Sequence, residues 1–454
     1  MSIADRQRRA YEALAASGAD APFLTERPAL FSPAAAAQDA LNTRGAYGRF
    51  AQILLPLEYT GWVEEATAHV RSCYIGDWTS LHKVRVRGPQ ALPFLDRLGM
   101  RGLSRFGIGH VRHHVQLDDD GYVASEGVLI RGGEREFVYT AGSCDWLLWR
   151  FSLGDWDAEV TDISPERFLF GVQGPASLPT LEKATGGSLR DLGFGRGRRA
   201  DLGGVPVDVL RTGISGELGY EVHGGADDAG AVWSAVLAAG EEFGIRQLGF
   251  RSQPVQHIEA GIATNGLDYL PSALLTPGAP RQFRRGTPGG SFVPAGGVAD
   301  YFRTPGELGW GFRGGVPERE FTGRDALAAQ YARGGPSRVL VGLVWNAGDV
   351  AEILTSLTGA GDIPDQMEVP RAPGPHFDQV TAAGEPVGIA TGRTLSPTLR
   401  ATVSLCVIAR EHAAPGTPVD VTWGRRGTPQ RTVRATVAAL PFKPDRRRTD
   451  VGGL

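Results

Sequence analysis

The sequence has very little lysine for its length. Of 454 residues, only Lys83, Lys183 and Lys443 are lysines, so almost every basic side chain is an arginine. None of the three follows a glycine, which excludes a Walker A loop, because that loop uses a Gly-Lys pair to reach phosphates. We attribute the bias mainly to genomic base composition, although the arginine guanidinium also suits planar carboxylates better than lysine does.

Cysteine is equally scarce. Cys73, Cys144 and Cys406 form no C-x-x-C pair, so the sequence offers neither a thiolate zinc site nor a disulfide framework, and a reducing compartment fits best. The pair His113-His114 does not indicate a metal either, because neighbouring residues on a strand point to opposite faces. We therefore expect no metal site.

The chain also lacks an excess charge of one sign. The 47 Lys and Arg residues nearly balance the 50 Asp and Glu residues, and the formal net charge is −3. A nucleic-acid-binding protein needs a basic surface to neutralise phosphates, so we do not expect that class. No window approaches the roughly eighteen uninterrupted apolar residues of a membrane helix, and the N-terminus has no apolar export signal. We expect a cytoplasmic protein without membrane insertion.

Motifs of several enzyme classes are missing as well. The run Gly193–Gly197 has Arg198 where the dinucleotide fingerprint requires its third glycine, so it is typical of a loop. Neither a G-x-S-x-G elbow nor an H-E-x-x-H helix occurs. Hydrolase and zincin chemistry therefore have no motif to rest on.

The patterns that are present predict an α+β fold. Residues 83–151 are predicted to form a strand, a turn and a helix, followed by two strands and a second helix. The two strands, 121–130 and 136–140, would form a hairpin. The same order recurs over residues 168–243. This repeat indicates two related units of split-βαβ type, each with its helices on one face of an antiparallel sheet.

The second half of the chain predicts a long connection and a barrel. Residues 274–336 are rich in Gly and Pro, which is typical of an irregular connection. Five short strands then predict a small antiparallel barrel: Val339–Val344, Pro386–Thr391, Ala401–Ile408, Pro418–Trp423 and Arg431–Val437. The expected division is a helical extension at 1–45, both units and the connection at 46–335, the barrel at 336–442 and a solvated tail at 443–454.

Five segments, in this order, resemble motifs of the folate-binding aminomethyltransferase family of the glycine-cleavage T-protein. They are Val172-Gln173-Gly174-Pro175, Arg211-Thr212-Gly213-Ile214-Ser215-Gly216-Glu217-Leu218-Gly219-Tyr220-Glu221-Val222, His257-Ile258-Glu259-Ala260-Gly261, Phe321-Thr322-Gly323-Arg324-Asp325-Ala326-Leu327 and Gly392-Arg393-Thr394-Leu395-Ser396-Pro397-Thr398-Leu399. The resemblance covers about residues 50–440. It implies the three-domain T-protein arrangement, a transferase activity and tetrahydrofolate as the cofactor.

Within that family, three shorter segments are most similar to tetrahydrofolate-dependent aryl O-demethylases of the vanillate and syringate type. They are Gly289-Gly290-Ser291-Phe292-Val293, Asp300-Tyr301-Phe302 and Glu307-Leu308-Gly309. This resemblance implies transfer of a methyl group from a small methoxy-aromatic acid, leaving 5-methyltetrahydrofolate. We expect a monomer or a homodimer.

The resemblance also implies a set of folate-binding residues. Glu221 would accept the two adjacent donors of the pterin ring, as a carboxylate accepts an arginine fork. Gln173, His113 and Tyr220 would lie beside the pterin, and Arg251 would hold the glutamyl tail or a neighbouring carboxylate. A purely structural role, in a strand, a turn or an ion pair, is the alternative for each.

The chain departs from its relatives at three positions. The T-protein has paired aspartates in its central hairpin, the first of them catalytic, whereas this chain has Ser125-Glu126. The aryl demethylases also lack the first aspartate, which favours them over aminomethyl transfer. Those demethylases carry an arginine and a tyrosine where this chain has Gly142 and Gln253, so their leaving-group residues are not reproduced.

A departing phenolate needs a proton or a hydrogen-bond donor near its oxygen. We expect His257, Glu126 and Ser125 to be the catalytic residues, His257 because an imidazole titrates near neutral pH. Three further residues are expected to contact the substrate: Tyr59, Trp62 and Gln253. Ordinary packing is the alternative for all of them.

Two other functions stay open. Gly142 and Gln253 would suit an N-methyl or S-methyl donor, or a natural-product intermediate, because a neutral or cationic leaving group needs no arginine. A folate-binding protein without methyl transfer, like the iron–sulfur assembly relatives, is of another class. Those relatives carry a cysteine motif in the linker, and this linker has no cysteine.

Overall fold

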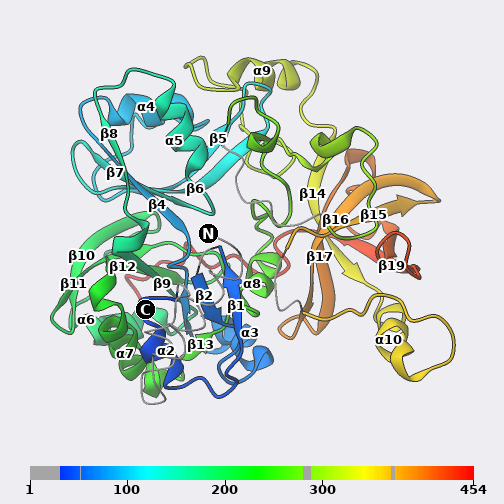
Figure 1. The fold of residues 1–454 in the computed structure, drawn as a ribbon, viewed down its shortest axis with the longest axis horizontal. Helices are drawn as coiled ribbons and strands as arrows, with labels where there is room; N and C mark the ends of the chain where they lie inside the picture. Colours follow the sequence, from blue (N-terminus) through cyan, green and yellow to red (C-terminus); the bar gives the residue numbers. More distant parts are fainter. Residues whose placement is uncertain (1–30, 52, 280–287, 370–373) are drawn as a thin grey trace, which may run out of the picture.

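The computed structural model describes residues 31–51, 53–279, 288–369 and 374–454. In this part of the chain, two sheets with their helices lie one above the other, and a barrel stands beside them (Figure 1). Most of the helical extension predicted at residues 1–45 lies outside the described residues. The first described helix is α2 (Ala35–Asp39).

The first unit is a five-stranded antiparallel sheet with the strand order β5-β6-β7-β4-β8. Its elements are β4 (His82–Arg87), α4 (Ala91–Leu98), β5 (Val111–Leu117), β6 (Val123–Arg131), β7 (Glu136–Ala141), α5 (Asp145–Ser152) and β8 (Glu159–Asp162). Side chains alternate between the faces of a strand, and the apolar face of this sheet packs against α4 and α5. The predicted hairpin is confirmed as β6 and β7.

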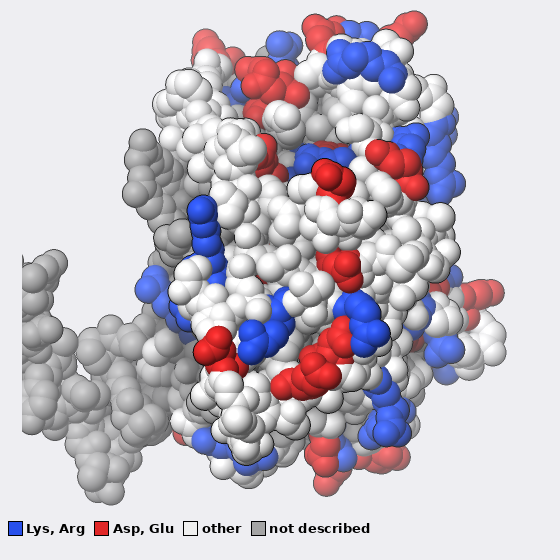
Figure 2. Space-filling model, turned by 90° about the vertical axis from the view of Figure 1, so that its right-hand side faces the viewer, with Lys and Arg blue, Asp and Glu red and all other residues white. Residues whose placement is uncertain are grey.

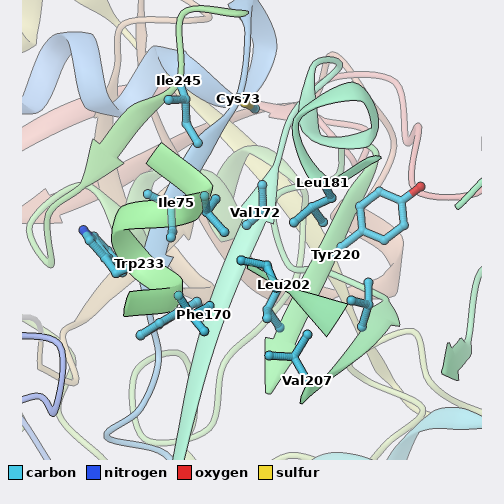
Figure 3. Close-up of a cluster of buried hydrophobic side chains, with 14 of the residues drawn as sticks. Cys73, Ile75, Phe170, Val172, Leu181, Leu202, Val207, Tyr220, Trp233 and Ile245 are labelled. Carbon is cyan, nitrogen blue, oxygen red and sulfur yellow. The ribbon is translucent and has the colours of Figure 1, made fainter. Parts of the chain in front are cut away.

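The second unit is a six-stranded sheet with the order β10-β11-β12-β9-β3-β13. Its strands and helices are β3 (Tyr74–Asp77), β9 (Arg167–Gln173), α6 (Ser177–Thr185), β10 (Arg196–Leu202), β11 (Val205–Arg211), β12 (Gly219–Gly225), α7 (Ala229–Gly240) and β13 (Arg246–Leu248). Phe170, Val172 and Trp233 are central in its core (Figure 3). Because β13 runs parallel to β3, this sheet is mixed, and the expectation of a fully antiparallel sheet is corrected here.

The two units repeat one topology. In the first, the opening strand β4 pairs with β7, the last strand of the β5–β7 meander; in the second, β9 pairs with β12 in the same way. Helices α4 and α6 follow the opening strands, and α5 and α7 follow the meanders. The prediction of two related split-βαβ units is confirmed. The difference between them is β3, which comes from upstream and inserts between β9 and β13.

The C-terminal barrel is closed and antiparallel, with the order β14-β17-β16-β15-β18-β19. Its strands are β14 (Arg338–Trp345), β15 (Phe377–Ala382), β16 (Glu385–Ser396), β17 (Ala401–Ala409), β18 (Pro418–Trp423) and β19 (Arg431–Ala438), and α10 (Ala347–Thr355) packs against it. The barrel and five of its strands were predicted; β15 was not. Before the barrel, the connection at 274–279 and 288–336 is irregular as expected apart from α9 (Arg324–Ala332) and short 3-10 turns.

Helix α8 (Gln253–Glu259) lies where the sheets and the barrel meet, beside α3 (Trp62–Arg71). Its last residue, Glu259, is fully buried. Glu259 Oε2 lies 3.0 Å from His69 Nε2, and Glu259 Oε1 accepts a hydrogen bond of 2.6 Å from Ser396 Oγ on β16. A buried carboxylate is stable only when it is paired in this way, so Glu259 ties α8 to α3 and to the barrel. A two-stranded sheet, β1 (Tyr47–Phe50) and β2 (Ile53–Pro56), precedes α3.

The C-terminal tail packs against the second unit through Lys443 and Val451, where the prediction that it is solvated is wrong, whereas Pro444, Asp445 and Arg446 are exposed as predicted. Lys443 Nζ donates a 2.7 Å hydrogen bond to Glu217 Oε1, and both side chains are buried. The Arg211 guanidinium donates to the Thr449 carbonyl, and Val451 joins the core of the six-stranded sheet. The run of charged residues predicted solvent exposure. The burial of Lys443 could not be predicted because its partner, Glu217, lies far away in the sequence.

Charged side chains of both signs are interspersed on the barrel side of the molecule (Figure 2). On this face no broad field of one sign is visible among the described residues. None of the described helices combines the length and the apolar character needed to cross a lipid bilayer.

Candidate functional site

One face of the six-stranded sheet carries Glu221. Glu221 on β12 is opposite Gly171 on β9, which is opposite Gly76 on β3, so all three lie on the same face. Glu221 Oε2 lies 3.0 Å from His223 Nε2, and the Glu221 side chain keeps 16% of its surface exposed. The carboxylate is therefore oriented by one neighbour and still accessible.

An aromatic side chain covers the two glycines beside Glu221. A Cβ at Gly76 would stand 2.4 Å from the Trp78 ring, and a Cβ at Gly171 would stand 2.9 Å from it. Only glycine leaves room for the indole to lie flat across these two strands. Tyr74, on the same face, has its ring centroid 6.1 Å from that of Trp78. The sequence analysis did not predict a role for Trp78. A glycine within a strand often marks a close approach of another group, so Gly76, two residues before Trp78, was a usable signal.

Gln173 lies on this face as well, but its amide oxygen is already engaged. Gln173 Oε1 accepts a 3.0 Å hydrogen bond from the backbone N–H of Ser215. Its side chain also fills the space that a Cβ at Gly213 or Gly219 would need. Gln173 thus holds the turn before β12, and through that turn it positions Glu221. The predicted amide contact to a pterin stays a prediction.

A second polar cluster surrounds Glu126 on the five-stranded sheet. Glu126 Oε2 lies 2.8 Å from His113 Nε2, and Glu126 Oε1 is 3.4 Å from the backbone nitrogen of Asn265. The His113 ring meets the Trp310 ring edge to face, with centroids 4.8 Å apart. The two sequence candidates on neighbouring strands, His113 and Glu126, are therefore brought together, and Trp310 from the long connection joins them.

Ser125 points to the other face of β6. Its hydroxyl lies 3.0 Å from the Tyr139 hydroxyl and donates to the Ser143 carbonyl at 3.2 Å. His114 shares this face: its Nε2 lies 3.0 Å from the Leu95 carbonyl. The expectation that His113 and His114 face opposite ways is thus confirmed. Burial lowers the pKa of His114 to about 4, which keeps its imidazole neutral.

Helix α8 runs between the Glu221 cluster and the Glu126 cluster. Gln253, in its first turn, donates from Nε2 to the backbone carbonyl of Asp77, next to Trp78. His257 lies four residues later on the same helix face, and its Nε2 is 3.3 Å from Asp268 Oδ2. Both side chains are buried. His257 therefore lies beside a carboxylate, and its Nε2 has no hydrogen-bond partner in the described part of the chain. It lies on the Glu126 side of the helix because Asn265 and Asp268 share one loop.

Arg251 and Trp62 form a separate group beside α3. Arg251 Nη1 donates to Glu58 Oε1 at 2.5 Å, and its Nε donates to the Val369 carbonyl at 3.0 Å. The guanidinium also lies 5.7 Å from the centroid of the Trp62 ring. These contacts match the structural ion pair considered as the alternative for Arg251. A contact from Arg251 to a ligand stays a prediction.

Two predicted site residues are core residues instead. Tyr220 follows the strand alternation and points away from Glu221 into the sheet core, where it is fully buried (Figure 3). Tyr59 belongs to the same core, with its ring centroid 6.4 Å from that of Trp233. We therefore correct both assignments: their packing leaves no face free for a cofactor or a substrate.

Family models match most of the chain. The GCVT N-terminal domain matches residues 37–274, and the glycine cleavage T-protein C-terminal barrel domain matches residues 366–443. Among solved structures, the glycine cleavage system aminomethyltransferase T of Bartonella henselae aligns with a TM-score of 0.68 at 20% identity, covering 91% of this chain and 98% of that one. At this identity the likeness concerns the fold.

Three curated relatives extend over nearly the whole chain. The sesamin methylene transferase of Sinomonas sp. (strain No.22) is 34% identical in an alignment of 434 positions that covers 89% of this chain and 94% of that protein. The syringate O-demethylase of Sphingobium sp. (strain NBRC 103272 / SYK-6) is 28% identical, covering 86% and 90%. The aminomethyltransferase of Saccharopolyspora erythraea is 28% identical, covering 87% and 94%. The chain belongs to the glycine-cleavage T-protein family, whose enzymes transfer one-carbon units with tetrahydrofolate.

Proposed function

We propose that this enzyme is an O-demethylase that transfers a methyl group from a small methoxy-aromatic compound to N5 of tetrahydrofolate. The observation that carries the proposal is the hairpin position occupied by Ser125, where the resembling T-protein motif has its first aspartate. The Ser125 hydroxyl is bonded to Tyr139, so the hairpin contributes one carboxylate, Glu126, to the site. A cationic aminomethyl centre would lack the carboxylate that accompanies it in the T-protein motif.

The residues around Glu221 fit a pterin ring. An accessible carboxylate can accept two parallel hydrogen bonds from the ring's amino group and the adjacent N–H. The Trp78 indole, spread across Gly76 and Gly171, offers an aromatic surface on the same sheet face. When bound, tetrahydrofolate supplies the nucleophilic nitrogen N5. Glu221 and Trp78 would hold and orient the ring from the second unit.

The Glu126 cluster would lie at the reacting end of the site. Transfer is fast only when donor carbon and acceptor nitrogen are held in line, so rigid groups on both sheets favour it. His113 fixes Glu126 from one side, and His257 with Asp268 supports the opposite loop. Glu126 and His257 stay our candidates for proton transfer. We no longer place Ser125 at the leaving group, because its hydroxyl is engaged behind the hairpin.

A methylene unit is the second candidate for the transferred one-carbon group. The relative with 34% identity is named for methylene transfer, while the one named for O-demethylation has 28%. A donor with an aryl methylenedioxy bridge would leave 5,10-methylenetetrahydrofolate instead of 5-methyltetrahydrofolate. The two functions share the folate site and the phenolic leaving group, so the folate product distinguishes them.

The test is a product assay without oxygen. Purified protein is incubated with tetrahydrofolate and a panel of methoxybenzoates, methylenedioxybenzenes, N-methylamines and S-methyl sulfonium compounds, and the folate products are separated by mass. The proposal expects 5-methyltetrahydrofolate from at least one methoxybenzoate, and much less of it with Glu221→Gln at a subsaturating folate concentration. Formation of 5,10-methylenetetrahydrofolate alone favours the second candidate, and products from amines or sulfonium compounds only overturn both.

A further inference from the structure

We propose that Tyr269, which no sequence motif singled out, donates the proton to the departing aryl oxygen. This inference rests on the proposed function, because it concerns the step in which the ether bond breaks. The chain has Gly142 and Gln253 where the resembling demethylases have their leaving-group residues. Another donor must therefore act there if an aryl ether is the substrate.

Tyr269 is a buried donor that lacks a partner. Its side chain is fully buried, and its hydroxyl has no hydrogen-bond partner in the described part of the chain. Nearly all buried hydroxyls in proteins are bonded to a protein group or to ordered water, so such an exception calls for an explanation. A ligand oxygen that arrives with the substrate would supply the missing partner.

The surroundings of Tyr269 place it in the Glu126 cluster. Tyr269 forms a backbone bridge with Asn265, and the nitrogen of Asn265 is the group near Glu126 Oε1. Its ring is also edge-on to Trp310, with centroids 6.2 Å apart, and Trp310 contacts His113 on its other side. Tyr269 therefore shares its neighbours with Glu126, although the two residues come from different parts of the fold.

The chemistry of a buried tyrosine suits this task. Burial, followed by the negative charge of Glu126, raises the pKa of Tyr269 well above its ordinary value, so the hydroxyl carries its proton at neutral pH. Tyr269 is therefore a weaker acid than the departing phenol, so its hydroxyl first stabilises the aryl oxygen as a hydrogen-bond donor and completes the proton transfer as a proton is relayed back to it from Glu126. Tyr269 also comes directly after Asp268, which fixes the loop because its Oδ2 accepts a 2.8 Å hydrogen bond from the Thr264 backbone nitrogen.

The protons balance within the cluster. As the O–CH₃ bond breaks, the aryl oxygen keeps the bonding electron pair and takes the proton of Tyr269. Glu126 accepts the proton displaced from N5 when the N–CH₃ bond forms there, and a water molecule carries that proton back to Tyr269. The net change is an aryl methyl ether and an N–H becoming a phenol and an N–CH₃ group, with no oxidant or reductant.

The test compares Tyr269→Phe with Tyr301→Phe, which removes the hydroxyl of another buried tyrosine, packed against Phe292 and Phe377. Aryl methyl ethers with leaving phenols from weakly to strongly acidic are used as substrates. We expect Tyr269→Phe to lower kcat about 10- to 100-fold for weakly acidic phenols and much less for nitrophenols. Tyr301→Phe should behave like the wild type.

A binding measurement adds a readout that does not depend on turnover. A nitro-substituted phenol is bound to the protein, and its ionisation is followed by absorbance against pH. Loss of the Tyr269 donor should raise the pH of ionisation by about one unit. An unchanged titration, or an equal loss of kcat for all leaving groups, overturns the assignment. If the wild type demethylates no aryl ether the proposed function fails, whereas the titration still tests Tyr269.

Discussion

Ser125 and Glu126 are adjacent in the sequence, yet their side chains leave opposite faces of β6. The Ser125 hydroxyl lies 3.0 Å from the Tyr139 hydroxyl, while Glu126 Oε2 lies 2.8 Å from His113 Nε2. A strand cannot present both positions to one ligand, because its side chains alternate. The hairpin therefore presents a single carboxylate, Glu126, on that face, and in the proposed function Glu221 of the second unit binds the folate.

Replacing Glu221 with Gln should weaken folate binding without unfolding the protein. The amide keeps the shape of the carboxylate but can accept only on one side, so at least one charge-assisted hydrogen bond to the pterin is lost. Such a bond contributes about 1.5–3 kcal/mol, which predicts a 10- to 100-fold weaker Kd. Titration calorimetry with tetrahydrofolate measures it. Glu385→Gln, at an exposed position of β16, is the control, and equal affinities of the two variants would refute the assignment.

Introducing an arginine at Gly142 should assist the leaving group. A Cβ at Gly142 would have no heavy atom within 4 Å, so the side chain can be accommodated. A guanidinium at this position would stabilise a developing phenolate, and we expect kcat/KM for methoxybenzoates with weakly acidic phenols to rise about tenfold.

The matched control for this variant is Gly132→Arg, which adds the same charge at the open far end of the hairpin. It should leave kcat/KM unchanged. If both variants change the rate equally, the effect is one of net charge, and the position of Gly142 has no special role.

Much of the fold could be predicted from the sequence because it depends on local patterns. Strands β4, β6, β7 and β9 alternate or carry apolar runs next to turn residues, and both units and the barrel followed from them. Strand β15 was missed because three of its six residues, Asp378, Gln379 and Thr381, are polar, which is typical of a loop. Strand β3 was missed because it pairs with β9, a partner that local patterns do not reveal.

The residues of the candidate site also fall into two groups, those that the sequence predicted and those that only the fold brings together. Glu221, Glu126 and His113 were found because they lie in or next to recognisable motifs. Trp310 and Tyr269 come from irregular segments, and only the folded chain brings them to the hairpin. Tyr220 was predicted wrongly from its motif. Its place in the motif suggested a ligand contact, whereas the alternation of side chains along β12 points its ring into the core.

The neutral imidazole of His114 should make stability depend on pH. Burial lowers its pKa to about 4, against 6.5 for an ordinary histidine. Between these values the unfolded chain binds more protons than the folded one, so stability is lost as the pH falls from 6.5 towards 4. The shift of about 2.5 units corresponds to roughly 3 kcal/mol.

Urea unfolding of the wild type and of His114→Gln across this pH range checks the prediction. The glutamine amide can still donate to the Leu95 carbonyl but does not titrate. The difference in unfolding free energy between the two proteins should therefore shift by about 3 kcal/mol between pH 7 and pH 4. Parallel curves would show that His114 is not the group responsible.

Lys443→Met should destabilise the protein through the tail. The substitution leaves the Glu217 carboxylate buried, with only Arg446 Nη1 at 3.9 Å from its other oxygen. Breaking a buried pair in this way costs about 3–5 kcal/mol. Lys183→Met is the control, because Lys183 and Glu242 are also 2.7 Å apart but exposed, so its effect should stay below about 1 kcal/mol. Equal melting temperatures for both variants would contradict a docked tail.

The transfer of a labelled carbon tests the central claim most directly. A methoxybenzoate carrying ¹³C in its methoxy group is incubated with the enzyme and unlabelled tetrahydrofolate, and the folate is examined by NMR and mass spectrometry. The proposed function predicts one ¹³C methyl group on N5 for each phenol formed, and about 10- to 100-fold less transfer by Glu221→Gln at a folate concentration below its Kd. Phenol formation with the label in free formaldehyde or methanol, and none on the folate, would contradict it.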